Sequence, residues 1–178
     1  MRARKVKKNI GAEKAVDWIR SLKLSPHPEG GYYRETYRSA GRVRAGRLPY
    51  NANSGRNLAT IIYYLLRRDQ FSPFHRLRSD EIWHFLDGSP VIIRMIAGNG
   101  KYSSTILGAS VACGERPEAV IGAGTWFAAE LADKTSFALV ACMVIPGFEF
   151  EDYDEAARAG LAAACPRHRR LIARLTRR

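Results

Sequence analysis

Side chains that can transfer protons or bind metal ions lie within one short stretch, residues 75–88. His75 stands six residues before Glu81, and Gly88 follows seven residues later. If this stretch is one extended strand, its odd-numbered positions share a face, because side chains alternate along a strand. His75 and Glu81 would then point into the same space. There they could bind a metal, transfer protons or form a buried hydrogen bond.

A second segment, residues 27–38, has ionisable or aromatic side chains at most positions. Arg34 could hold a carboxylate or phosphate through two hydrogen bonds, and the tyrosines could stack on a sugar or a base. The alternative is an edge strand paired across a dimer, in which Arg–Glu pairs set the register. The residues favour neither interpretation over the other.

Three stretches of the chain resemble one family of the cupin superfamily, the DUF985 or Cupin_5 group. They are LSPHPEGGYYRETYRS (24–39), HRLRSDEIWHFLDGSP (75–90) and VIPGFEFEDYD (144–154). The spacing of His75, Glu81 and Gly88 is similar to the first cupin motif, and GTWFAAE (124–130) extends the resemblance to residues 12–156. It implies an all-β fold, a cupin-type double-stranded β-helix or jelly-roll barrel, which is usually a homodimer.

The resemblance also implies where a metal would be held. Metal-binding cupins use three histidines and a glutamate, but two of the histidine positions are Leu77 and Phe127 here. A transition metal needs about three or four nitrogen, oxygen or sulfur donors. We therefore expect no metal and no other cofactor. His84 could add a donor only if a bulge changed its face, because it alternates with Glu81.

His75 and Glu81 are the candidate catalytic residues, with a tyrosine as the acid by analogy to fold-related sugar epimerases. A structural His–Glu pair explains the same residues equally well. We expect His75, Glu81 and Arg34 to face one cavity. The candidate ligand-binding residues are polar or aromatic: Glu29, Tyr32, Tyr33, Arg34, Glu35, Tyr37, His84 and Trp126.

The elements that must position these residues can be predicted from periodicity. Residues 12–22 carry apolar side chains at helical spacing, which predicts a short amphipathic helix. LATIIYYLL (58–66) is a continuous apolar run, typical of a buried strand. DGSP (87–90) and NGK (99–101) predict two hairpin turns. After residue 156 the chain is rich in alanine and arginine, and Pro166 divides it into two helical pieces.

The net charge of +12 is concentrated at the two ends of the chain. Residues 1–10 hold five basic groups and residues 165–178 hold six, both without an acid, whereas the rest carries 18 basic and 17 acidic groups. We therefore expect a basic N-terminal tail (1–11), a cupin domain (12–156) and a basic helical extension (157–178). Such ends could contact nucleic acid, but a solvated tail is the favoured interpretation.

These features together predict a cytoplasmic protein without a membrane segment. The leading hypothesis is that it binds a small polar ligand, such as a sugar or nucleotide-sugar, and acts as a metal-independent epimerase or isomerase. The alternative is a non-catalytic ligand-binding or interaction module. Nucleic-acid association through the basic ends is a third hypothesis.

Overall fold

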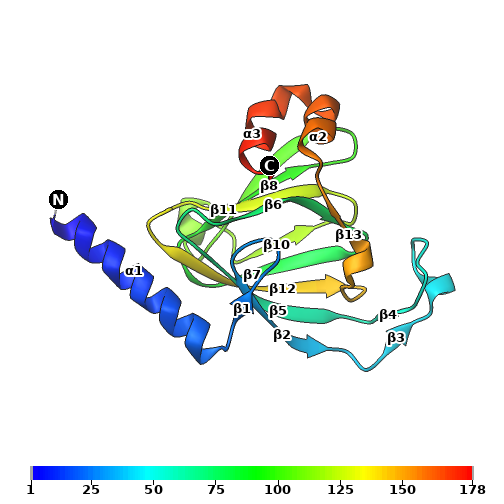
Figure 1. Cartoon of the computed structure of the whole chain (residues 1–178), viewed down its shortest axis with the longest axis horizontal. Coiled ribbons are helices and arrows are strands. Elements are labelled where there is room, and N and C mark those ends of the chain that lie inside the picture. Colours follow the sequence, from blue (N-terminus) through cyan, green and yellow to red (C-terminus); the bar gives the residue numbers. More distant parts are fainter. Residues whose placement is uncertain (1, 178) are drawn as a thin grey trace.

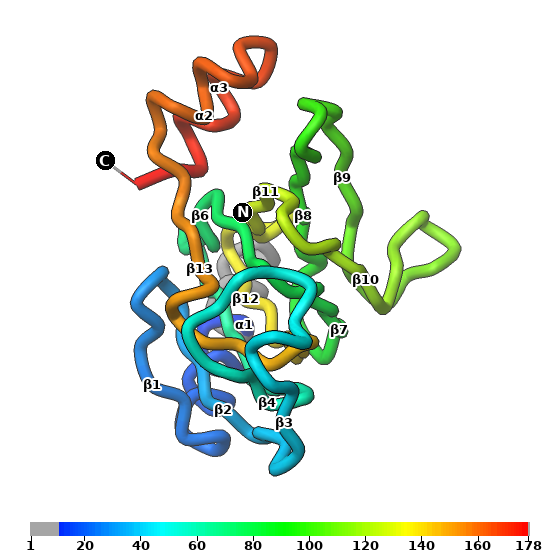
Figure 2. Tube along the Cα trace, turned by 90° about the vertical axis from the view of Figure 1, so that its right-hand side faces the viewer, coloured from blue at the N-terminus to red at the C-terminus, as the bar shows by residue number. Residues whose placement is uncertain are grey.

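Two antiparallel sheets face each other and enclose a barrel in the computed structural model, which describes residues 2–177 (Figures 1 and 2). The six-stranded sheet has the order β1 (Ser25–Pro26), β2 (Tyr32–Arg38), β5 (Thr60–Arg67), β12 (Phe137–Ile145), β7 (Asp80–Gly88) and β10 (Glu118–Ile121). The five-stranded sheet has the order β13 (Tyr153–Glu155), β6 (Phe71–Leu77), β11 (Trp126–Leu131), β8 (Val91–Ile96) and β9 (Tyr102–Leu107). This architecture confirms the predicted all-β jelly-roll class.

The connections add small elements around the barrel. β3 (Arg42–Val43) and β4 (Arg56–Asn57) form a two-stranded ribbon. Short 3-10 turns cover Ala45–Arg47, Val111–Cys113 and Phe150–Asp152. The predicted turn at 99–101 joins β8 to β9 as a hairpin. The predicted hairpin at 87–90 is wrong, because β7 and β8 belong to different sheets and the chain crosses the barrel there.

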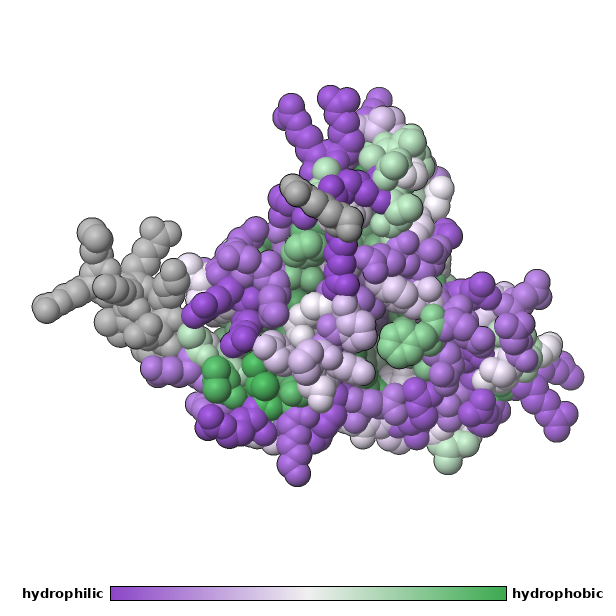
Figure 3. Space-filling model, in the orientation of Figure 1, coloured by the Kyte–Doolittle hydropathy of each residue, from purple (hydrophilic) through white to green (hydrophobic). Residues whose placement is uncertain are grey.

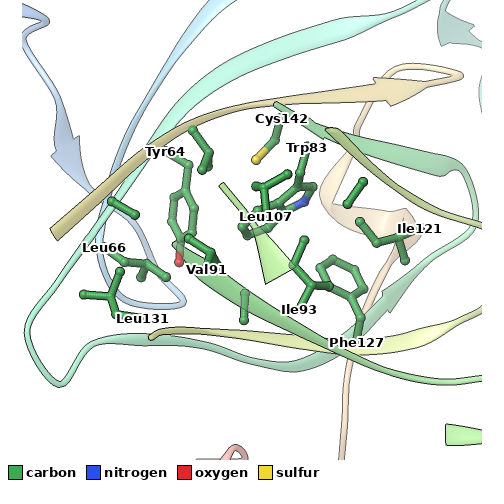
Figure 4. Close-up of a cluster of buried hydrophobic side chains, with 14 residues drawn as sticks. Tyr64, Leu66, Trp83, Val91, Ile93, Leu107, Ile121, Phe127, Leu131 and Cys142 are labelled. Atoms are coloured by element: carbon green, nitrogen blue, oxygen red, sulfur yellow. The ribbon is translucent and has the colours of Figure 1, made fainter. Parts of the chain in front are cut away.

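The apolar run in β5 faces the core on one side, and helix α1 (Arg2–Ser21) covers the other side at Tyr63 and Leu65, which explains why this part does not alternate with polar residues. Tyr64 and Leu66 point into the barrel and join its main core, drawn in Figure 4. Leu65 points outward and packs against helix α1. The core fills one end of the barrel and leaves the other end for polar side chains.

Helix α1 is longer than the predicted 12–22 helix, because it begins at Arg2. The expected basic tail, residues 1–11, is therefore helical backbone from residue 2. Lysine and arginine are good helix formers, and no proline interrupts this part of the chain. Ala15 and Trp18 lie against Leu139 of the six-stranded sheet. The Trp18 indole also donates to Asp87 at 2.7 Å.

The C-terminal extension forms two short helices, α2 (Arg158–Ala164) and α3 (Arg169–Arg174), as predicted. Pro166 begins the 3-10 turn between them. Leu161, Ile172 and Leu175 pack on the outer face of the five-stranded sheet. Long hydrophilic side chains project from these helices at the top of Figure 3, and hydrophilic residues predominate on that face. No helix within residues 2–177 is long and apolar enough to cross a bilayer.

Candidate functional site

The polar end of the barrel contains a cavity of about 270 Å³. This volume lies just below the ~300–1,000 Å³ typical of ligand pockets, so it suits a small organic molecule. The strands β2, β5, β6, β7 and β12 supply its walls, together with the turn at residues 27–31 and the segment at residues 148–153. Its ionisable side chains are His27, Glu29, Tyr33, Glu35, Arg38, Tyr64, His75, Glu81, Cys142, Glu149 and Tyr153.

His75 and Glu81 both line this cavity, but from different sheets. The expectation that one strand carries them is wrong, because β6 ends at Leu77 and β7 begins at Asp80. The chain turns the corner between the two sheets at residues 78–79. The two side chains therefore approach the cavity from opposite walls of the barrel, where a ligand can lie between them.

The His75 ring is held in one tautomer by its backbone neighbour. Nδ1 lies 2.8 Å from the carbonyl oxygen of Pro73. A carbonyl oxygen can only accept, so Nδ1 carries the hydrogen and Nε2 keeps the lone pair. The ring packs against Phe127, with 4.1 Å between the centroids. Burial lowers the pKa of His75 to about 4, so the imidazole is neutral at pH 7.

The Glu29 carboxylate lies beside the His75 ring, with Oε2 3.8 Å from Nδ1. The turn that carries Glu29 enters the barrel mouth because Gly30 and Gly31 both have positive φ angles. A Cβ at Gly31 would lie 2.6 Å from the Leu65 carbonyl oxygen, so only glycine fits there. Burial, and then repulsion from Glu81, raise the pKa of Glu29 to about 8. Glu29 therefore holds a proton at pH 7.

Glu81 is buried and incompletely hydrogen-bonded. Its Oε2 atom has no hydrogen-bond partner among the described residues, and the same is true of the Tyr153 hydroxyl. Burial raises the pKa of Glu81 to about 7, and the nearby Trp83 and Cys142 side chains oppose the rise. Buried polar atoms are almost always paired in folded proteins. Glu81 Oε2 and the Tyr153 hydroxyl lack a well-formed hydrogen bond, although Trp83 lies near Glu81 and Glu29 lies near Tyr153. A ligand or ordered water in the cavity would complete both oxygens.

A bulge in β2 decides which side chains of this strand enter the cavity. Glu35 pairs with Ile62, and Tyr37 pairs with Ile61, so Thr36 is an extra residue. The alternation shifts at that point, and Arg38 faces inward after Tyr33 and Glu35. The Arg38 guanidinium pairs with Glu35 and Glu149, each at 2.8 Å. Arg38 thus holds the position that we expected for Arg34.

The other predicted ligand-binding residues lie outside the cavity. Arg34 is exposed and pairs in register with Tyr63 on the outer face of β2. The expectation that Arg34 shares the cavity with His75 is therefore wrong, since alternation sends it to the opposite face from Tyr33. Tyr32, Tyr37 and His84 lie on the same outer face, and Trp126 lies beneath Arg76 on the outside of the five-stranded sheet.

The cavity also contains residues that sequence reasoning did not select, namely Arg38, Cys142 and Tyr153. Tyr33 and Tyr64, two of the four tyrosines considered as the acid with Tyr37 and Tyr63, line it as well. His27 belongs to the polar segment but was not chosen; its Nδ1 accepts from the Glu29 amide at 3.1 Å. Tyr153 stood inside a stretch that carried the family resemblance, which was the available signal. No sequence signal distinguished Arg38 from the other residues of the segment 27–38, because a bulge cannot be recognised in a single sequence.

The donors present do not fit the cupin metal centre. Leu77 lines the cavity, and Phe127 pairs in register with His75, so apolar groups occupy both remaining histidine positions. His84 points outward and bonds Glu118 at 2.9 Å. Within residues 2–177, no three His, Cys, Asp or Glu side chains are arranged to hold a metal ion. The expectation of a metal-free barrel stays a prediction.

The rim segment, Phe148–Asp152, borders the cavity and is fixed at several points. The Phe148 amide donates to Thr60 at 2.9 Å, and Arg38 bonds Glu149. At the far end, Asp152 accepts two hydrogen bonds from Arg56, whose side chain is fully buried. Phe150 remains 60% exposed. The rim therefore offers an aromatic surface on a firmly held segment.

Comparisons with known proteins agree with this fold. The family model described as Cupin superfamily (DUF985) matches residues 16–156. The uncharacterized protein YML079W of Saccharomyces cerevisiae is 33% identical over 145 residues, which cover 76% of this chain and 71% of that protein.

Solved structures resemble the chain over most of its length. Protein SO0799 from Shewanella oneidensis is 37% identical with a TM-score of 0.79, covering 90% of this chain and 96% of that one. A hypothetical protein from Leishmania major is 32% identical with a TM-score of 0.83, covering 92% and 99%. Oxalate decarboxylase from Bacillus subtilis, at 14% identity, 84% and 36% coverage and a TM-score of 0.52, shares the fold alone.

Proposed function

Because the chain belongs to the DUF985 family of the cupin superfamily, we propose that its barrel binds a small polar molecule and moves a proton on it. The observation that carries this proposal is the pair of unpaired buried oxygens, Glu81 Oε2 and Tyr153 Oη, in one cavity. A ligand with hydroxyl or carbonyl groups would satisfy both. The cavity can enclose a single sugar ring, whereas the rest of a nucleotide-sugar would extend past the rim.

Proton transfer is supported by groups that hold protons differently at pH 7. The pKa of Glu81 is about 7 and that of Glu29 is about 8, so one can accept a proton while the other donates. Groups with pKa values near the working pH are the most efficient acids and bases. His75 adds a lone pair at Nε2. This set of groups favours an isomerase or epimerase reaction that needs no metal. We propose that a homodimer carries out this reaction in the cytoplasm.

Native mass spectrometry of freshly purified protein tests the binding step. We expect a small-molecule adduct on the wild type that is absent from His75→Gln and Glu81→Gln. His84→Gln is the matched control, because this histidine lies on the outer face and should keep the adduct. Equal adducts on all four proteins, or none on any, would contradict binding in the barrel.

Incubation of the released molecule with protein in deuterium oxide tests the chemical step. An isomerase that removes a proton from carbon should introduce deuterium at that carbon, and Glu81→Gln should not. If the molecule binds but gains no deuterium at carbon, the chain is a non-catalytic binding module.

A further inference from the structure

The C-terminal extension reaches back to the turn that closes the cavity. Nη1 of Arg177 donates to the carbonyl oxygen of Pro28 at 2.7 Å. Nη2 lies 3.6 Å from the position that a Cβ would take at Gly30. Pro28 stands between two residues of the cavity, His27 and Glu29. One guanidinium from the far end of the chain therefore covers the outside of this turn.

The residues before Arg177 are fixed to the barrel. The Leu175 carbonyl oxygen accepts from the Phe74 amide at 2.8 Å, directly beside His75. Arg158 bonds both the hydroxyl and the carbonyl of Thr176, which is 4% exposed. Arg174 pairs with Glu130 on the five-stranded sheet. The backbone at residue 177 is therefore held in place, although its side chain is exposed.

Glu29 is surrounded mainly by acidic and neutral groups. His75 and Glu81 face it from the two sheets, and Tyr153 and Glu155 face it from β13. Burial, Glu81 and Glu155 raise its pKa, whereas Tyr153 and Arg177 oppose the rise. Arg177 is the cation among these neighbours. The pKa of His27 is lowered first by burial and second by the positive charge of Arg177.

We propose that Arg177 is a positioning residue of the cavity, through which the extension holds the His27–Gly31 turn against the barrel. The positive charge also favours the ionised form of Glu29 and the neutral form of His27. The inference rests on the proposed function, because it assigns a role to a turn that supplies two groups to that site. It makes residues 157–177 part of the site rather than an appendage.

Three substitutions separate this role from a general effect of charge. Arg177→Gln removes the cation, and Arg177→Lys keeps it. Arg170→Gln removes another exposed cation of the extension, whose side chain forms no hydrogen bond or ion pair with the side chains described for residues 11–177. Nuclear magnetic resonance of the free protein supplies two readouts, the titration of the His27 ring and the hydrogen exchange of the His27 and Gly30 amides, which bond within the turn.

In Arg177→Gln we expect the His27 pKa to move upward from about 4. We also expect the two amides to exchange about two- to tenfold faster, as the loss of one hydrogen bond implies. Arg177→Lys should keep the wild-type titration, and Arg170→Gln should match the wild type in both readouts. Wild-type titration and exchange in a folded Arg177→Gln would overturn the inference, as would equal shifts in Arg170→Gln.

Neither readout needs a ligand, so the two proposals can fail separately. A cavity that binds nothing would overturn the proposed function and leave the effect of Arg177 on the turn intact. A ligand-binding protein with an unchanged turn in Arg177→Gln would do the reverse.

Discussion

At the scale of single residues, the cavity contains three ionisable side chains, Glu29, His27 and His75, that burial keeps neutral at pH 7. The pKa of Glu29 lies at about 8 and those of His27 and His75 at about 4. Burial is the first cause in all three cases. Glu81, with a pKa of about 7, is therefore the main source of charge deep in the cavity at pH 7. Other charged groups gather near the rim, where Arg38 meets Glu35 and Glu149. A ligand should place its neutral hydroxyl or carbonyl groups deepest.

We predict that Glu29 makes the folded state less stable as the pH rises from 6.5 to 8. In this window folded Glu29 keeps a proton that the unfolded chain has released, because the ordinary pKa is 4.5 and the folded one about 8. The free energy of unfolding should fall by up to about 2 kcal/mol. The buried histidines have the opposite effect, but only below about pH 6.5. Urea unfolding at several pH values measures the slope.

Glu29→Gln should reduce this slope, because glutamine carries no titrating proton. Glu81, whose pKa is raised to about 7, should supply the slope that remains near pH 7. Glu13→Gln on the exposed side of α1 is the control and should keep it. An unchanged slope in Glu29→Gln would mean that Glu29 is ionised in the folded protein at pH 7.

We also predict that the barrel holds no stoichiometric transition metal. Leu77 and Phe127 stand at two ligand positions, which leaves too few donors around His75. Elemental analysis of protein purified without chelator should give far less than one iron, zinc, manganese or nickel per chain. One metal per chain that disappears in His75→Ala would refute the prediction.

At the scale of elements, the sequence predicted the strands better than the way they bend. The resemblance predicted that His75 and Glu81 face one interior, and both line the cavity. The β2 residues predicted to bind a ligand came from both faces of this strand, and of these only Tyr33 and Glu35 line the cavity. The reason given for His75 and Glu81 was wrong, since a sheet corner separates them. Corners and bulges depend on contacts with distant strands, which a single sequence does not display. The bulge in β2 is the reason that Arg38, and not Arg34, reaches the cavity.

The rim segment gives a prediction at this scale. Arg56 is fully buried and bonds Asp152, so Arg56→Met leaves a buried carboxylate without its cation and with the Tyr50 hydroxyl as its remaining side-chain donor. We expect a loss of about 3–5 kcal/mol in the free energy of unfolding. Lys14→Met breaks an exposed pair with Asp87 and should cost at most about 1 kcal/mol. Equal losses in urea unfolding would show that burial of the Arg56 pair is not what fixes the rim.

At the scale of the whole molecule, the outer face of the six-stranded sheet carries an apolar row across five strands. The strand register aligns Tyr37, Ile61, Met143, Ile82 and Val120. Tyr37 and Val120 are 51% and 57% exposed. Open apolar sheet surfaces and edges favour association. The row is a candidate contact surface for the homodimer that the family resemblance implied.

Sedimentation equilibrium at micromolar concentration should therefore give a dimer. Val120→Lys should shift it toward monomer, whereas Val111→Lys, at an exposed site away from the row, should not. A wild type that sediments only as monomer would remove the prediction.

The fixed rim segment has a consequence in time. Hydrogen bonds hold Phe148, Glu149 and Asp152, and breaking the buried Arg56 pair would be slow compared with diffusion. A mouth that does not need to open admits its ligand in one step. The observed association rate should then rise linearly with ligand concentration. A lid that had to move before or after binding would instead make this rate level off at high ligand concentration.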